Sequence, residues 1–79
     1  KNIDNKNNKE NLLILDNMYK LFAAMVFWNI IPTSKEYSLL ILSGFKINDK
    51  ESVRRSKITY NEAKTLQYNL DESINQYIN

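Results

Sequence analysis

The sequence of 79 residues contains no cysteine and no histidine, and it has only one glycine and one proline. The absence of cysteine excludes disulfide bonds, thiolate metal sites and a cysteine nucleophile. The absence of histidine removes the most common general base and an ordinary zinc ligand. A single glycine excludes a glycine-rich phosphate loop. We therefore expect no metal site, no cofactor and no catalytic residue, and we predict that the protein is not an enzyme.

The overall composition is that of an ordinary small folded domain. Hydrophobic residues make up 43% and charged residues 25% of the chain, as is usual for one globular domain. The net charge of +2 is too small to indicate nucleic-acid binding by itself. The longest apolar run covers residues 21–28, well short of the ~18 residues that a membrane-spanning helix needs, so we expect no membrane segment. Because the chain begins with Lys1 and not with methionine, we expect it to be a domain of a longer protein.

Residues 1–10 differ from the rest of the chain in hydrophobicity. They contain one apolar side chain, so they bury too little surface to offset the entropy lost on ordering. We predict that residues 1–10 form a disordered polar tail or linker. Residues 11–79 contain the apolar side chains of a single domain, which we predict to be all-α.

The first predicted helix covers residues 11–31. Its apolar side chains form two neighbouring stripes at spacings of three and four residues. One stripe consists of Leu12, Leu15, Tyr19, Phe22 and Val26, and the other consists of Leu21, Met25 and Trp28. Because the helix is apolar nearly all round after Leu21, we expect other helices to surround it and to bury Phe27 and Trp28. We expect Pro32 to end it, because a residue before proline is disfavoured in the α conformation.

A capping box marks the start of the second predicted helix, over residues 33–42. In such a box the Thr33 hydroxyl and the Glu36 carboxylate satisfy free amide groups of the first turn. Gly44 stands where a left-handed residue commonly ends a helix, so we expect it to terminate this one. The apolar run 39–42 is also compatible with a strand, but the cap and the glycine favour a helix.

Two further helices complete the predicted domain. A short third helix is expected from Asn48 or Asp49 to about Ile58. A second capping box over residues 59–62 predicts a fourth helix that extends to residue 78. The apolar stripe of the fourth helix consists of Ala63, Leu66, Leu70, Ile74 and Tyr77. Because the four lengths are unequal, we predict a small four-helix bundle with a crossed, orthogonal arrangement.

Five residues are candidates for binding a protein partner. Segment 46–64 is basic, and three of its cations are close together in the sequence: Arg54, Arg55 and Lys57. These cations predict either a solvated face or an electropositive patch for an acidic partner. Tyr37 and Tyr68 are predicted at the edge of the core with their hydroxyl groups outward, and tyrosine is frequent at interfaces. Ordinary boundary tyrosines explain the same pattern.

The order of apolar segments resembles a known family. The segments are Leu12–Asp16, Ile30–Thr33, Glu36–Tyr37 and Leu39–Leu40, followed by two more predicted helices. Residues 11–79 resemble the ACDC domain that accompanies Apetala-type DNA-binding domains in apicomplexan transcription factors. The twelve asparagines fit an AT-rich genome of that kind. The resemblance implies four crossed helices, a nuclear location, and a role in recruiting an unidentified protein partner instead of reading DNA. We expect a monomer or a weak dimer.

Two other functions remain as alternatives. Residues 67–71 resemble the end of the signature of small phosphatases that act on the aspartyl phosphate of sporulation response regulators. That resemblance implies that Asp71 orients the attacking water. The second alternative is direct DNA binding through the basic segment 46–64, which salt dependence would reveal.

Overall fold

The structure is a computed structural model that describes residues 5–78. The helices in chain order are α1 (Asn5–Phe27), α2 (Ser34–Ile47), α3 (Lys50–Thr65), the 3-10 helix η1 (Glu72–Ile74) and α4 (Asn75–Ile78). The predicted all-α domain of four helices is confirmed, and there is no strand within residues 5–78.

The first helix begins earlier than the sequence predicts. Helix α1 starts at Asn5, so residues 5–10 of the predicted polar tail are helical. Extending an existing helix costs much less than nucleating one, so polar residues can prolong its N-terminal end. Residues 1–4 lie outside the described part of the chain.

A left-handed asparagine ends α1, and Pro32 does not. Asn29 has φ 61°, its amide donates to the Val26 carbonyl at 3.0 Å, and the Ile30 amide donates to the Met25 carbonyl at 2.8 Å. This pattern is a Schellman motif, which satisfies the last carbonyl groups of a helix. The helix therefore ends at Phe27, and Pro32 lies in the connection to α2.

The predicted capping box at the start of α2 is present, but the predicted end is wrong. The Thr33 amide donates to Glu36 Oε1 at 2.6 Å, and the Lys35 amide donates to Thr33 Oγ1 at 3.2 Å. Helix α2 then continues through Gly44 to Ile47, where Asn48 takes the left-handed conformation at φ 57°. The only glycine of the chain thus lies inside a helix.

Helix α3 runs through the predicted boundary between the third and fourth helices. The Thr59 hydroxyl does not cap a new helix, because it donates to the Arg55 carbonyl one turn earlier, at 2.9 Å. The helix ends near residue 65 in a second Schellman motif, with Gln67 at φ 64° and the Tyr68 amide donating to the Ala63 carbonyl at 3.0 Å. The prediction of one continuous helix over residues 59–78 is therefore wrong.

Replacing Gln67 by glycine is expected to stabilise the domain by about 0.5–1 kcal/mol. A left-handed backbone strains a residue that has a Cβ, and glutamine lacks the short side chain that helps asparagine tolerate this conformation. Glycine relieves the strain, although it costs more backbone entropy on folding. Urea unfolding followed by circular dichroism measures the change. The exposed neighbour Thr65 is helical, so Thr65→Gly is the matched control, and it should destabilise the domain by about 0.5–1 kcal/mol.

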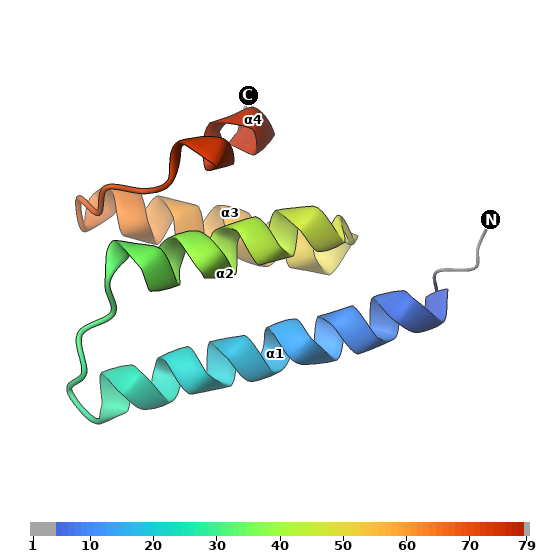
Figure 1. The fold of residues 1–79 in the computed structure, drawn as a ribbon, viewed down its shortest axis with the longest axis horizontal. Coiled ribbons are helices and arrows are strands. Elements are labelled where there is room, and N and C mark those ends of the chain that lie inside the picture. Colours follow the sequence, from blue (N-terminus) through green and yellow to red (C-terminus); the bar gives the residue numbers. More distant parts are fainter. Residues whose placement is uncertain (1–4, 79) are drawn as a thin grey trace.

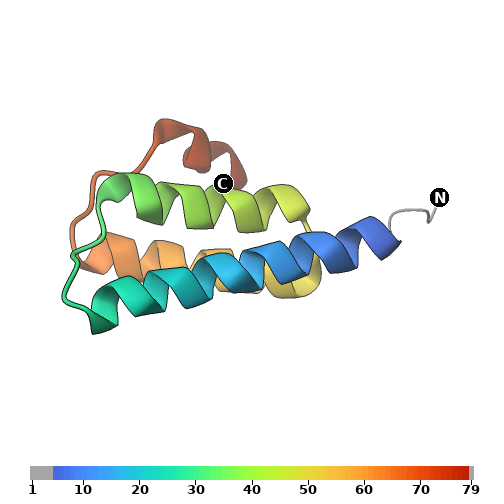
Figure 2. The ribbon, with the colours of Figure 1, turned by 60° about the horizontal axis from the view of Figure 1, so that its bottom comes forward.

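The three long helices run alongside one another. The angles at which they cross are therefore smaller than in the orthogonal arrangement predicted from their lengths. Figures 1 and 2 show α2 and α3 as an antiparallel pair, with α1 packed along one side of the pair. The segment that contains η1 and α4 returns over α2 on the side away from α1 (Figure 1). The extents along the principal axes are 41 × 30 × 15 Å, so the molecule is flat.

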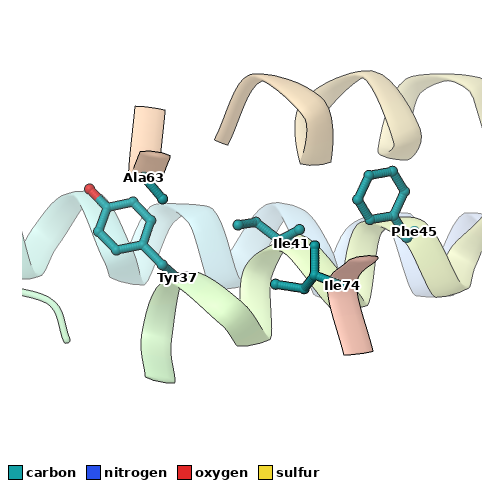
Figure 3. Packing of buried hydrophobic residues seen from close by; sticks show 5 residues of the cluster. All are labelled: Tyr37, Ile41, Phe45, Ala63 and Ile74. Carbon is teal, nitrogen blue, oxygen red and sulfur yellow. The ribbon is translucent and has the colours of Figure 1, made fainter. Parts of the chain in front are cut away.

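The core lies mainly between α2, α3 and the C-terminal segment. Figure 3 shows its centre, to which α2 contributes Tyr37, Ile41 and Phe45, α3 contributes Ala63 and η1 contributes Ile74. A flat molecule has little interior, and only seven apolar residues are buried within the described part of the chain. Among the same described residues, eleven large apolar side chains are exposed. Where such side chains form one contiguous patch, they mark a binding surface.

Candidate docking surface

The three cations of the predicted basic patch divide between two places: Arg54 and Lys57 line one hollow with Lys50, whereas Arg55 packs against α1. Arg54 forms a bidentate ion pair with Glu51. Its Nε donates to Oε1 at 3.1 Å, and its Nη2 donates to Oε2 at 2.5 Å. The Arg54 guanidinium lowers the pKa of Glu51. Lys57 is exposed and lines a hollow beside Phe45 and Tyr77. Arg54 and Lys57 are therefore accessible, but the charge of Arg54 is already balanced.

Arg55 holds α1 against α3. Its guanidinium carbon lies 4.2 Å from the centre of the Tyr19 ring, and its Nη1 lies 3.4 Å from Asp16 Oδ1. The Tyr19 hydroxyl lies 2.6 Å from Thr59 Oγ1, and burial raises the pKa of Tyr19. The Tyr19 and Thr59 hydroxyl groups both lie within hydrogen-bond distance of the Arg55 carbonyl, at 3.3 Å and 2.9 Å, so the three groups form one hydrogen-bonded cluster between α1 and α3. Arg55 is thus half-buried in a contact between helices and is not displayed for a partner.

The two candidate tyrosines lie together, with their ring centres 4.4 Å apart. Tyr37 is only 4% exposed, so its predicted place at the edge of the core is wrong. Its hydroxyl donates to Glu62 Oε2 at 3.3 Å, and burial raises the pKa of Tyr37 to about 12, with the charge of Glu62 acting in the same direction. Tyr68 is half-buried, and its hydroxyl donates to the Pro32 carbonyl at 2.7 Å. Both hydroxyl groups therefore serve the fold.

The segment that resembles a phosphatase signature forms a loop. Residues 67–71 follow the end of α3, and the Asp71 carboxylate accepts hydrogen bonds from the amide and the hydroxyl of Ser73. These bonds lower the pKa of Asp71 and cap η1. The same residue has its amide bonded to Ser38 Oγ at 3.0 Å, which ties the loop to α2. Asp71 therefore has a structural task in this position.

Two other classes of site are absent from the described part of the chain. Residues 5–78 contain no group of three or more acidic side chains close enough to hold a metal ion. None of the helices in the same range combines the length and hydropathy needed to cross a membrane.

An apolar stripe follows one side of α1. Its residues alternate at spacings of four and three: Ile14, Met18, Leu21, Met25 and Trp28. Ile14 is 57% exposed, Leu21 is 67% exposed and Trp28 is 71% exposed, while the two methionines are partly covered. Alternating spacings of three and four place side chains on one seam of a helix, as in the contact positions of a coiled coil. The stripe is therefore a continuous apolar ridge.

A groove separates this ridge from α2. Two adjoining hollows share Met18; one extends toward Met25 and Leu39, and the other extends toward Ile14 and Ile47. Only two charged side chains line these hollows, Glu36 in the first and Lys46 in the second. We call the ridge, the groove and exposed Leu39 the α1–α2 face. Its lining is mainly apolar, with one charge in each hollow and with Asn11 and Ser43 in the second, and sites for a peptide or a helix have this composition.

The aromatic pair at the end of α1 is exposed and not buried as predicted. Phe27 is 77% exposed and Trp28 is 71% exposed, and their rings meet edge to face at 5.4 Å between centres. Ile31 nearby is 79% exposed. The prediction that other helices surround this part of α1 is wrong because α2 and α3 pack against only one of its sides.

The sequence showed the apolar stripe of this site but not that the stripe is exposed. The stripe of Leu21, Met25 and Trp28 is visible by spacing, and Ile14 and Met18 extend it by two further turns. Periodicity alone does not distinguish an apolar face that another helix of the same chain covers from one that stays open. No known protein family, no curated protein and no solved structure matches this chain.

Proposed function

We propose that this domain is a non-catalytic protein-interaction module that binds its partner through the α1–α2 face. The observation that carries the proposal is the ridge of α1, on which three large apolar side chains are more than half exposed: Ile14, Leu21 and Trp28. Such exposure is unfavourable in water unless a partner covers it. Methionine and tryptophan are enriched in surfaces that bind proteins.

The shape of the face favours a helix as the bound element. The hollows beside α1 extend from Asn11 to Met25. This distance corresponds to about 21 Å at ~1.5 Å per residue, or about four turns of an incoming helix. An amphipathic helix binds in such a groove through apolar anchor residues at positions i, i+3 or i+4, and i+7 of its sequence. The domain therefore fits a helical ligand better than an extended one.

The cellular setting proposed for the module rests on the resemblance to ACDC domains. On that basis, we propose that the domain belongs to a nuclear transcription regulator and recruits a protein partner there. The α1–α2 face supplies a physical means for such recruitment. The side chains of Arg54, Arg55, Lys57, Tyr37 and Tyr68 are not part of this surface.

Selection of helical peptides tests the proposed function. A displayed library of helix-forming peptides is panned against the domain, and the peptides recovered should carry apolar residues at helical spacing. Their binding should fall at least ten-fold with Leu39→Glu, which places a charge at the groove. It should be unchanged with Arg54→Glu, the matched surface variant. Recovery of no selective peptide, or equal binding to both variants, would rule out the α1–α2 face as the site.

A further inference from the structure

We infer that an open hollow at the junction of α2 and α3 binds a short acidic segment of a protein partner, in which an apolar side chain lies among carboxylates. The hollow, which we call the basic hollow, is lined by Phe45, Lys46, Asn48, Val53, Lys57 and Tyr77. Its volume is about 460 Å³, within the ~300–1,000 Å³ of ligand sites. It is a second surface that shares only Lys46 with the α1–α2 face, so the inference does not rest on the proposed function.

The basic hollow gathers positive charge without a carboxylate in its lining. Lys46 reaches it from α2 and Lys57 from α3, and both side chains are exposed. An adjoining hollow continues along α3 to Lys50 and Arg54. Within residues 5–78, none of the three lysines forms an ion pair. Like charges that face one hollow repel one another, so a bound carboxylate is stabilised there by charge complementarity.

Helix stability does not account for this arrangement of cations. Lys46 is in the last turn of α2, where the helix dipole favours a positive charge. Lys50, by contrast, is the first residue of α3, where the dipole disfavours one. Positions 50, 54 and 57 lie on one face of α3 and extend about 10 Å along it. A positively charged edge placed partly against the helix dipole is better explained by a ligand than by folding.

The floor of the basic hollow is apolar. Phe45 is only 5% exposed, and Figure 3 shows it at one end of the row of core side chains. The ring of Tyr77 stacks on it at 5.1 Å between centres, and both Tyr77 and Val53 are half-buried. The aliphatic stems of the lysines add further apolar surface. The matching ligand therefore carries an apolar side chain beside its negative charges.

The charged groups of the site favour carboxylates over phosphates. Phosphorylated motifs are generally bound by arginine clusters, because a guanidinium matches a phosphate with two hydrogen bonds. The arginine of this edge, Arg54, already makes such a pair with Glu51. A nucleic acid needs cations along a whole strand, whereas Asp49 and Glu51 interrupt this edge. A short acidic peptide meets the lysines without meeting these carboxylates.

An NMR titration of the isotope-labelled 79-residue domain tests the basic hollow. The probe is a peptide with one central leucine and two glutamates on each side, added at low salt up to about 1 mM. The affected amides should centre on residues 45–57 and 77. Lys57→Glu should weaken binding about ten-fold or more, and Lys57→Gln, which only removes the charge, about three-fold. Lys64→Glu, also exposed on α3, is the matched control and should change binding less than about two-fold.

Peptides that differ in one feature test the class of ligand. Glutamine in place of every glutamate should abolish binding, and glycine in place of the leucine should weaken it about five-fold. Equal binding of the glutamate and glutamine peptides would overturn the inference, as would equal losses with Lys57→Glu and Lys64→Glu. Binding of a phosphoserine peptide or of oligothymidine, but not of the glutamate peptide, would assign the hollow to phosphate and overturn it as well.

The two proposals fail separately. Leu39→Glu should leave binding of the acidic peptide unchanged, and Lys57→Glu should leave binding of the selected helical peptides unchanged. Helical peptides that bind while the acidic peptide does not would overturn the basic hollow and leave the proposed function standing. The reverse result would remove the α1–α2 face as a site and leave the basic hollow. Lys46 lines both surfaces, so its variants are not used to separate them.

Discussion

Gly44→Ala is expected to lower the free energy of unfolding by about 3 kcal/mol. A Cβ at residue 44 would overlap the Ser56 hydroxyl and lie 2.7 Å from the Ser52 backbone oxygen, so α2 and α3 would have to separate. That separation weakens two buried bonds, from Ser52 Oγ to the Gly44 carbonyl at 2.8 Å and from Ser56 Oγ to the Ile41 carbonyl at 2.7 Å. Alanine is the better helix former by about 1 kcal/mol, but overpacking between two backbones outweighs this gain.

Urea unfolding followed by circular dichroism measures the effect of Gly44→Ala. Ser43→Ala, one residue earlier on α2 and only half-buried, is the matched control and should change stability by less than about 0.5 kcal/mol. A double-mutant cycle with Ser56→Ala should show coupling of about 1 kcal/mol, because one of the two overlaps is relieved. The relief is partial, since the Ser52 backbone oxygen stays in place. A Gly44→Ala variant as stable as the natural chain would show that the helices are not in close contact here.

Ile74→Ala is expected to cost about 3 kcal/mol, which is typical of a large-to-small change at a buried site. Ile74 is fully buried among α2 side chains, although it belongs to a three-residue helix near the end of the chain. It anchors a C-terminal segment that has few other attachments, among them the stacking of Tyr77 on Phe45 at 5.1 Å between ring centres. A domain of this length has a total stability of roughly 4–12 kcal/mol, so the loss is a large share.

Ile31→Ala provides the comparison for Ile74→Ala. The same atoms are removed, but Ile31 is 79% exposed, so at low protein concentration stability should change by less than about 0.5 kcal/mol. Hydrogen exchange adds a local measurement: Ile74→Ala should speed exchange of amides in residues 72–78 more than in the centre of α2. Equal costs for the two isoleucines would contradict the proposed anchoring of the C-terminal segment.

The local sequence located the starts of α2 and α3 but not those of the first and fourth predicted helices, and it was a poor guide to helix ends. The capping box at Thr33 and Glu36 formed as predicted, because its hydrogen bonds join residues three positions apart. The helix ends are at Asn29, Asn48 and Gln67, where the backbone is left-handed without glycine. Local propensity points to Gly44 and Pro32 instead. Tertiary packing decided against it, because Gly44 is needed where two helices meet closely.

The candidate site shows the same division between local and tertiary information. Spacing alone revealed the apolar stripe of Leu21, Met25 and Trp28, yet hydrophobicity predicted burial for Trp28, which is 71% exposed. Spacing in the sequence also grouped Arg54 and Arg55, but Glu51 pairs with the first and Asp16 with the second. Asp16 lies 39 positions from Arg55, so no local pattern could have predicted that pair.

By itself, the sequence determined an all-α domain without cysteine or histidine chemistry, the α2 cap and the apolar seam of α1. These features depend on residue types and on spacings of three or four positions, which a helix converts directly into geometry. Only the tertiary structure decided which side of α1 is covered. Helices α2 and α3 have one shared flank on which α1 packs, so the rest of its apolar surface stays open. The single glycine and the single proline of the chain follow the same rule: Gly44 marks a close helix contact, and Pro32 accepts a hydrogen bond from Tyr68 through its carbonyl.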